Sequence, residues 1–146
     1  MTALLLANAA ATFFMVGLIW FVQVVHYPLF AKVGELEFAG YHLLHSSRTT
    51  WVVLPAMAIE LATSWLLLVE PPAGQTALAL AGAILALLTW VLTGYAASIH
   101  GRIGRHGPSS VLLRTLLNGN LLRAAVWTLH GAVVLALLAI ALDRGI

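Results

Sequence analysis

Residues 76–99 read TALALAGAILALLTWVLTGYAASI and contain no charged side chain. At about 1.5 Å of rise per residue, an α-helix of this length spans roughly 36 Å, which exceeds the ~30 Å hydrocarbon core of a bilayer. An apolar run of about 18 residues or more without charges is typical of a transmembrane helix. This stretch therefore predicts a membrane span.

Further apolar stretches of similar length cover about residues 3–25, 49–69 and 119–142. With short connections, four spans use up the whole chain of 146 residues. The chain is 62% hydrophobic and only 8% charged, whereas soluble domains carry roughly a quarter charged residues. We therefore expect an all-α fold in which residues 1–146 form a single domain, an integral membrane four-helix bundle.

Proline and glycine mark the expected ends of these spans. The sequence His-Tyr-Pro at 26–28 is expected to end the first helix, because proline disfavours helix at the preceding residue and cannot donate to the hydrogen-bond ladder. The segment 70–74 predicts a tight turn, and the glycines and proline of 101–108 predict a loop. Segment 109–117 is expected to form a short helix at the membrane interface.

Lysine and arginine are distributed unevenly between the two ends of the expected bundle. One basic residue lies beyond the last span, and the others lie in or beside the 1–2 and 3–4 connections: Arg144 against Lys32, Arg48, Arg102, Arg105, Arg114 and Arg123. Short loops rich in basic residues remain in the cytoplasm. We therefore predict that both termini are outside the cytoplasm, in a multi-pass protein of the bacterial inner (cell) membrane.

The composition also restricts chemistry and partners. The chain has no cysteine, which excludes disulfides, thiolate nucleophiles, iron–sulfur clusters and cysteine-based zinc sites. It has no basic run of the length that nucleic-acid binding requires. The expected partners are membrane lipid and a lipophilic small molecule. Small-residue helix faces also favour a homo-oligomer or a subunit of a larger membrane complex.

Four histidines at the cytoplasmic ends of the helices are the candidate metal ligands: His26, His42, His45 and His100. His42, His45 and Arg48 are three residues apart, so they share one helix face. Neutral imidazoles bind transition metals, and two from different helices can hold haem iron. The cofactor is therefore expected to be either a transition metal or haem. The candidate residues for contacting it are Gln23, Tyr27, Asn120 and Trp127.

A second polar cluster is expected deeper in the membrane. Glu60 lies about 11 residues into its span, roughly 16 Å at 1.5 Å per residue, and His130 lies at a similar depth in the last span. A carboxylate at this depth must face the bundle interior and be paired, and is by default a functional candidate. Glu60 and His130 are expected to relay protons, while Arg48 and Arg123 orient the substrate; these four are the candidate catalytic residues.

Several stretches carry a family resemblance. Residues 20–30 (WFVQVVHYPLF) and 41–48 (YHLLHSSR), with Pro55 and Glu60, resemble a set of small bacterial four-span membrane proteins. His100 and residues 120–127 (NLLRAAVW) resemble the same set. That set is loosely similar to the anthrone-oxygenase-like family, which has four spans and an Asn-x-x-Arg pattern on its last helix. The resemblance implies a four-span fold and assigns no substrate.

The residues are compatible with more than one class of function. The leading hypothesis is a membrane-embedded redox protein or oxygenase, with a His-ligated metal or haem, acting on a lipophilic aromatic or isoprenoid substrate. The alternative is a non-enzymatic transporter, pigment-binding protein or accessory subunit of a membrane complex. A lipid-binding scaffold is a third class, and a carboxylate in mid-span fits it worst.

The absence of cysteine makes single-cysteine variants a clean test of orientation. We expect Ser109→Cys, in the arginine-rich connection, to be protected from a membrane-impermeant maleimide in intact spheroplasts. Ala73→Cys, in the opposite turn, should be labelled, because positive charge holds the other connections in the cytoplasm. Permeabilised cells, in which both cysteines react, provide the control, and the reverse pattern in intact cells would show that the orientation is inverted.

Overall fold

The computed structural model describes residues 1–143, and all secondary structure in this range is helical. The first span consists of α1 (Thr2–Phe21), a π-helical turn η1 (Val22–His26) and α2 (Tyr27–Phe30). The longer helices are α3 (Glu35–Val69), α4 (Thr76–His106) and α5 (Ser110–Asp143). Arg144, the basic residue expected at the opposite end from the others, lies outside the described residues.

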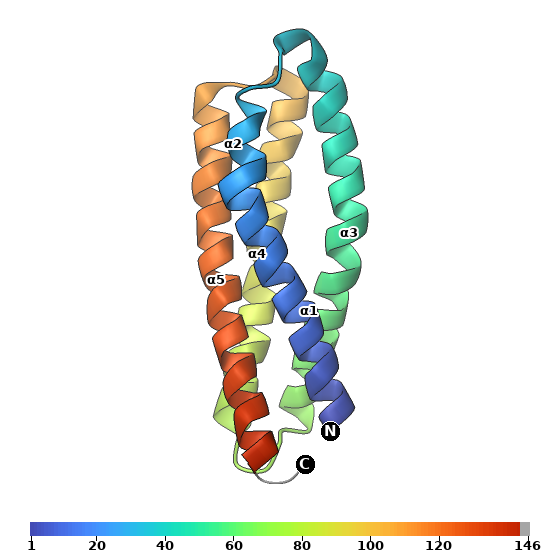
Figure 1. Cartoon of the computed structure of the whole chain (residues 1–146), viewed down its shortest axis with the longest axis vertical. Helices are drawn as coiled ribbons and strands as arrows, with labels where there is room; N and C mark the ends of the chain where they lie inside the picture. Colours follow the sequence, from blue (N-terminus) through green and yellow to red (C-terminus); the bar gives the residue numbers. More distant parts are fainter. Residues whose placement is uncertain (144–146) are drawn as a thin grey trace.

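The helices form an up-and-down bundle (Figure 1). Both α1 and α4 pack against α3 and against α5, so each helix has antiparallel neighbours. The N-terminus, the α3–α4 turn and the end of α5 lie at one end, here called the terminal end. The α2–α3 and α4–α5 connections lie at the other, here called the histidine end.

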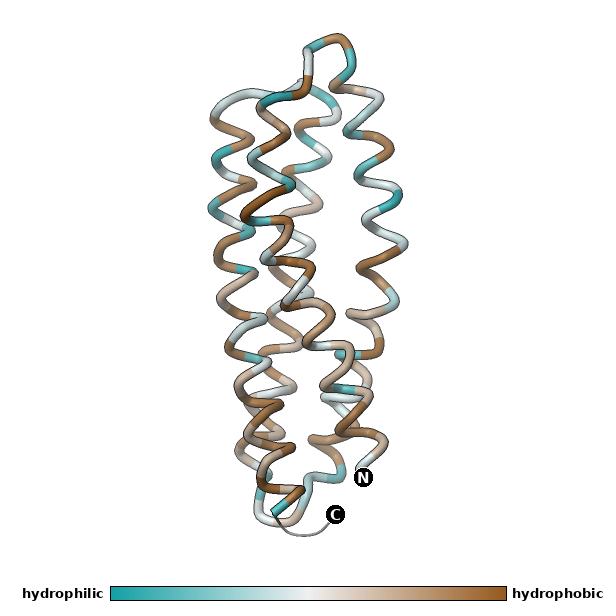
Figure 2. Tube along the Cα trace, viewed as in Figure 1, coloured by the Kyte–Doolittle hydropathy of each residue, from teal (hydrophilic) through white to brown (hydrophobic). Residues whose placement is uncertain are grey.

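Four helical segments are long and apolar enough to cross a membrane: Thr2–Phe30, Glu35–Val69, Thr76–His106 and Ser110–Asp143, with a mean hydropathy of 2.0 to 2.2. Figure 2 shows hydrophobic residues along all of them. Large apolar side chains such as Leu36, Trp51 and Val69 are exposed on the outside, where lipid solvates them and water would not. The expected all-helical four-helix bundle is therefore confirmed, with these helices as its candidate membrane spans.

The helices extend further towards the histidine end than the sequence patterns predict. The prediction that segment 26–28 ends the first helix is wrong, because the helix continues to Phe30. Most of the expected 101–108 loop is also helical: α4 ends where Gly107 adopts a φ of 76°, a conformation that favours glycine. Of the segment 109–117, residues 110–117 form the first part of α5 and are not a separate helix.

The π-helical turn explains how the first helix passes Pro28. In a regular α-helix the proline ring would clash with the carbonyl of Val24, four residues earlier, and leave it without a donor. Here the chain widens, and the Tyr27 N–H bonds to the carbonyl of Val22, five residues earlier. The inserted residue rotates the following chain by about 100°. Such single π turns are frequent at functional sites.

Packing is closest in the terminal half of the bundle. The buried face of α4 there consists of small residues, Ala79, Gly82, Ala83 and Ala86, at helical spacing. Small residues let helix backbones approach one another, and van der Waals contact is the main attraction between helices in lipid. A Cβ atom added at Gly82 would lie 3.7 Å from Nε2 of His130 on α5. This half therefore provides a closely packed base for the histidine end.

Candidate functional site

The four candidate histidines meet at the histidine end, although they come from three helical segments. Nε2 of His26, at the end of η1, lies 2.7 Å from Nδ1 of His45 on α3. Nε2 of His42 on α3 lies 3.0 Å from Nδ1 of His100 on α4. The ring centroids of His45 and His100 are 5.4 Å apart, so the two pairs adjoin. These four rings are called the histidine cluster below.

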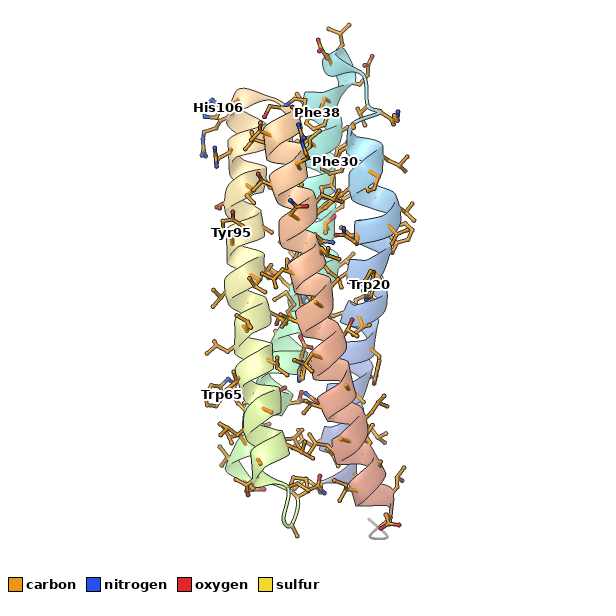
Figure 3. The ribbon with its side chains drawn as sticks, turned by 90° about the vertical axis from the view of Figure 1, so that its left-hand side faces the viewer. Trp20, Phe30, Phe38, Trp65, Tyr95 and His106 are labelled. Carbon is orange, nitrogen blue, oxygen red and sulfur yellow. The ribbon has the colours of Figure 1, made fainter. Side chains whose placement is uncertain are left out.

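Aromatic and hydroxyl side chains hold the histidine cluster in place. The Tyr27 hydroxyl lies 3.0 Å from Nε2 of His100, which engages the second nitrogen of that ring. The Phe30 ring packs edge-on against His26 and His45, with centroids 5.2 and 5.0 Å away. Phe38 stacks on His42 at 5.7 Å. Figure 3 labels both phenylalanines near this end of the bundle.

The close contacts between the rings determine which imidazole nitrogens donate a hydrogen bond and which accept one. A neutral imidazole carries one N–H and one lone pair, so each N···N contact consists of one donating and one accepting ring. The accepting lone pairs are also the groups that coordinate transition metals. Within residues 1–143, no group of three or more His, Cys, Asp or Glu side chains is placed so that it could hold a metal ion.

A pocket of about 830 Å³ lies beside the histidine cluster. It is lined mainly by α3 and α4, at the end where α3 stands apart from the other helices in Figure 1. Leu43 and Leu54 of α3 line it and are also exposed, so the pocket reaches the surface of the bundle along α3. Its volume lies within the range of roughly 300–1,000 Å³ that is typical of small-molecule sites.

Arg123 of α5 lines the inner part of this pocket, and its side chain is buried. Nη1 donates to the Asn120 side-chain carbonyl and Nη2 donates to the Thr93 hydroxyl, both at 3.2 Å. The Asn120 amide in turn donates to the Gln23 carbonyl oxygen at 2.9 Å. These hydrogen bonds join η1, α4 and α5 and fix the position of the guanidinium.

Glu60 forms the centre of the deeper polar cluster and is fully buried. The Trp127 indole N–H donates to both of its carboxylate oxygens, at 3.1 and 3.0 Å. Nδ1 of His130 lies 2.9 Å from the same carboxylate, which confirms the pairing expected from their depths. The Asn8 amide donates to the hydroxyls of Thr63 and Ser64, at 2.8 and 2.9 Å. These contacts connect α1, α3 and α5 in the middle of the bundle.

Trp127 connects the two polar clusters. Its indole N–H points to Glu60, while the Arg123 guanidinium carbon lies over its ring, 5.3 Å from the centroid. Trp127 does not line the pocket. The buried guanidinium therefore lies over the face of the indole ring, and the buried carboxylate lies at the N–H edge of the same ring.

The expected site residues are not all found together. Tyr27 and Arg123 line the pocket with three of the four histidines, while His26 contacts them through His45. The residues that lie beyond the pocket lining are Gln23, Asn120, Trp127, Glu60 and His130. Arg48 is exposed and does not line the pocket, so its expected role in orienting a substrate finds no support in this geometry.

Sequence reasoning missed several residues that build the site. Thr49 contacts His45 at 3.2 Å, and Thr93 accepts a hydrogen bond from Arg123. Hydroxyl side chains are common in membrane helices, so their positions carried no signal. Asn8 did carry one, because an amide inside an otherwise apolar span must find a partner.

No protein-family model, curated protein or solved structure matches this chain. The geometry of the pocket, the histidine cluster and the deeper polar cluster is therefore the basis for assigning a function.

We expect Glu60→Ala to lower the stability of the bundle by about 2–4 kcal/mol, since it leaves the buried N–H groups of Trp127 and His130 without an acceptor. Glu60→Gln, which keeps one acceptor oxygen, should cost less. Thermal unfolding of purified protein in detergent measures both. The matched control is Glu70→Ala at the exposed end of the same helix. Equal melting temperatures for Glu60→Ala and Glu70→Ala would contradict a structural role for the pair.

Proposed function

We propose that this protein is a membrane-embedded oxidoreductase of the oxygenase type. In this proposal the histidine cluster binds a redox-active transition metal, and the adjoining pocket holds a lipophilic substrate. The observation that carries it is the meeting of four imidazoles, from three helical segments, at a pocket that reaches the surface of the bundle along α3. Structural histidines have no need to gather around a space for a ligand.

The spacing within each histidine pair is compatible with two imidazoles on one metal ion. Nitrogen ligands about 2.0–2.1 Å from one ion lie about 2.9–3.4 Å from each other. The contacts within the two histidine pairs, 2.7 and 3.0 Å, are close to this range. Binding requires the ion to replace the proton shared within a pair and the rings to turn slightly. Bringing both pairs to the same ion would require the rings to rearrange, since no group of three or more ligands among residues 1–143 is placed to hold one. Four nitrogen donors without thiolate suit copper or iron among the redox metals.

The same spacing argues against haem. Two axial histidines on one haem iron have nitrogens about 4 Å apart, with the macrocycle lying between their rings. In both histidine pairs the nitrogens are already in hydrogen-bond contact. The aromatic rings of Phe30 and Phe38 also pack directly against the cluster. We therefore favour a metal ion over a macrocycle.

The pocket supports a substrate that arrives through the membrane. Its opening at the surface of the bundle along α3 lets a lipophilic molecule enter from the bilayer without crossing water. Phe38, Val53 and Ile103 provide apolar walls, and Tyr27 provides a hydroxyl beside His100. Such walls place the reactive end of the molecule against the histidine cluster and keep water away from it.

We assign Glu60 and His130 a positioning role instead of proton relay. Their hydrogen bonds reach towards the pocket only through the Trp127 N–H, and an indole N–H is a donor only. Glu60 instead fixes Trp127, on which Arg123 lies. The pair also leaves a second candidate function open: a buried carboxylate and imidazole in mid-membrane are typical of proton-coupled transport.

The proposal includes the cellular setting. The concentration of basic residues at the histidine end supports a cytoplasmic location for that end, with both termini outside, in a bacterial cell membrane. The histidine cluster would then lie near the cytoplasmic leaflet. His26 and His100 face other histidines, which disfavours the pigment-binding alternative, since that requires a histidine facing lipid or a partner.

We expect protein purified through a histidine-free affinity tag to contain about one copper or iron ion per chain. His45→Ala and His100→Ala should each weaken metal binding by more than the about 10–100-fold loss of affinity that is typical of removing a supporting residue. The purified variants should therefore contain little metal. Elemental analysis by mass spectrometry, together with the absorption spectrum, measures this. His106→Ala is the control, because His106 is exposed at the end of α4 (Figure 3).

Wild-type protein without stoichiometric transition metal, when purified from its native host, would refute the redox proposal. Metal content that is unchanged in His45→Ala and His100→Ala would move the ion away from the histidine cluster. In either case, proton-coupled uptake into proteoliposomes that is lost in Glu60→Gln would support the transport function.

A further inference from the structure

Arg123 carries a buried positive charge that has no ion-pair partner among residues 1–143. Its side chain is only 5% exposed. Its hydrogen bonds go to the neutral side chains of Asn120 and Thr93, and it also interacts with the Tyr27 hydroxyl; its Nε has no hydrogen-bond partner. The single ion pair in the described part of the chain joins Glu60 and His130. The guanidinium is therefore held in place by neutral groups and left without a neutralising anion.

A charge in this position is costly for the protein to maintain. Burial removes water from the guanidinium, and an unpaired buried charge is unfavourable unless another group compensates for it. The contact with the Trp127 ring compensates only in part, because a cation–π interaction is weaker than an ion pair. A buried and unpaired arginine in a membrane protein is a functional candidate for this reason.

Glu60 does not neutralise Arg123 directly. Both of its carboxylate oxygens accept hydrogen bonds from Trp127, and one also contacts His130. The open space next to the Arg123 guanidinium is instead the pocket, which it lines together with Tyr27 and Thr93. An anion in the pocket is thus the partner that the guanidinium lacks.

The pocket also restricts the rest of the ligand. Arg123 lies 20 residues from Asp143 at the terminal end of α5, about 30 Å along the helix. This length is close to the thickness of the hydrocarbon core, so Arg123 would lie near the edge of the core at the histidine end. The space beside it has a volume of about 830 Å³. Its walls are largely apolar, with Phe38, Val53 and Ile103 among them, and Glu35 is the one carboxylate among the lining residues. A ligand here needs an apolar body as well as a negative end.

We propose that Arg123 binds the oxyanion of an amphipathic, lipid-soluble molecule whose apolar body occupies the pocket between α3 and α4. An arginine can bind a carboxylate through two parallel hydrogen bonds, which gives this site its selectivity. A lipophilic carboxylic acid is the simplest ligand of this class, and an anionic lipid headgroup offers the same chemistry. The inference rests on the proposed function for the pocket, whose substrate class it names, and does not require the metal.

The test compares two probes that share the same apolar body and differ in the head group, an ionised carboxylate against a neutral hydroxyl. 1-Pyrenebutyric acid and 1-pyrenebutanol are titrated into protein in phosphatidylcholine nanodiscs at about pH 8, where the acid is ionised. Energy transfer from tryptophan to pyrene reports binding, and empty nanodiscs correct for partition into lipid. We expect wild-type protein to bind the acid at least about tenfold more tightly than the alcohol, because a charged hydrogen bond replaces a neutral one.

Three variants locate the selectivity. Arg123→Gln should abolish the preference for the acid, and Arg123→Lys, which keeps the charge without the fork geometry, should keep part of it. Arg102→Gln removes an exposed arginine at the same end of the bundle and should leave the preference unchanged. Equal binding of acid and alcohol by wild-type protein, or a preference that survives in Arg123→Gln, would overturn the proposal. If Arg123→Gln fails to fold, the wild-type and lysine measurements still decide.

Two further arms separate the sources of the ligand and the two proposals. Competition by phosphatidylglycerol in the nanodisc, seen with wild type and unchanged in Arg102→Gln, would identify a lipid headgroup as the oxyanion. No competition supports a free acid. Metal content is measured in the same samples. Acid selectivity in protein that never binds metal would support the anion site and refute the redox centre. Stoichiometric metal without acid selectivity would support the redox centre and refute the anion site.

Discussion

The interior of a bilayer offers no hydrogen bonds, so every polar side chain inside the bundle must find its partners there. Glu60 imposes this constraint most strongly, because a carboxylate in mid-membrane cannot face lipid. Its contacts with Trp127 and His130, and those of Asn8 with the same part of α3, fix how α1, α3 and α5 are rotated. His42 lies 18 residues along α3 from Glu60, five full turns, so the same rotation turns it inwards.

The two halves of the bundle differ in how their helices pack. In the terminal half, small residues on α4 let the helices approach closely. In the histidine half, the rings of Tyr27, Phe30 and Phe38 fill the space around the imidazoles, and α3 stands apart. The open pocket therefore depends on the closely packed half, because a gap between two helices persists only where the rest of the bundle holds them.

Hydropathy was sufficient to predict the four helices, because a membrane span is determined by length and composition. Depth along each helix was sufficient to pair Glu60 with His130. The sequence could not show that the histidines meet, since this depends on the rotation of each helix about its axis, which only the polar contacts fix. The helix end expected at Pro28 was wrong for a local reason: a π turn supplies the wider spacing that proline needs.

The charges of the site link the two proposals. A divalent ion held by neutral imidazoles would add positive charge near the Arg123 guanidinium, which lines the same pocket as His100. Glu60, the carboxylate of the deeper cluster, is engaged by Trp127 and His130. An oxyanion in the pocket would lower the cost of both positive groups. Since such coupling is reciprocal, metal and anionic ligand should each strengthen the binding of the other, and a vacant pocket should hold metal weakly.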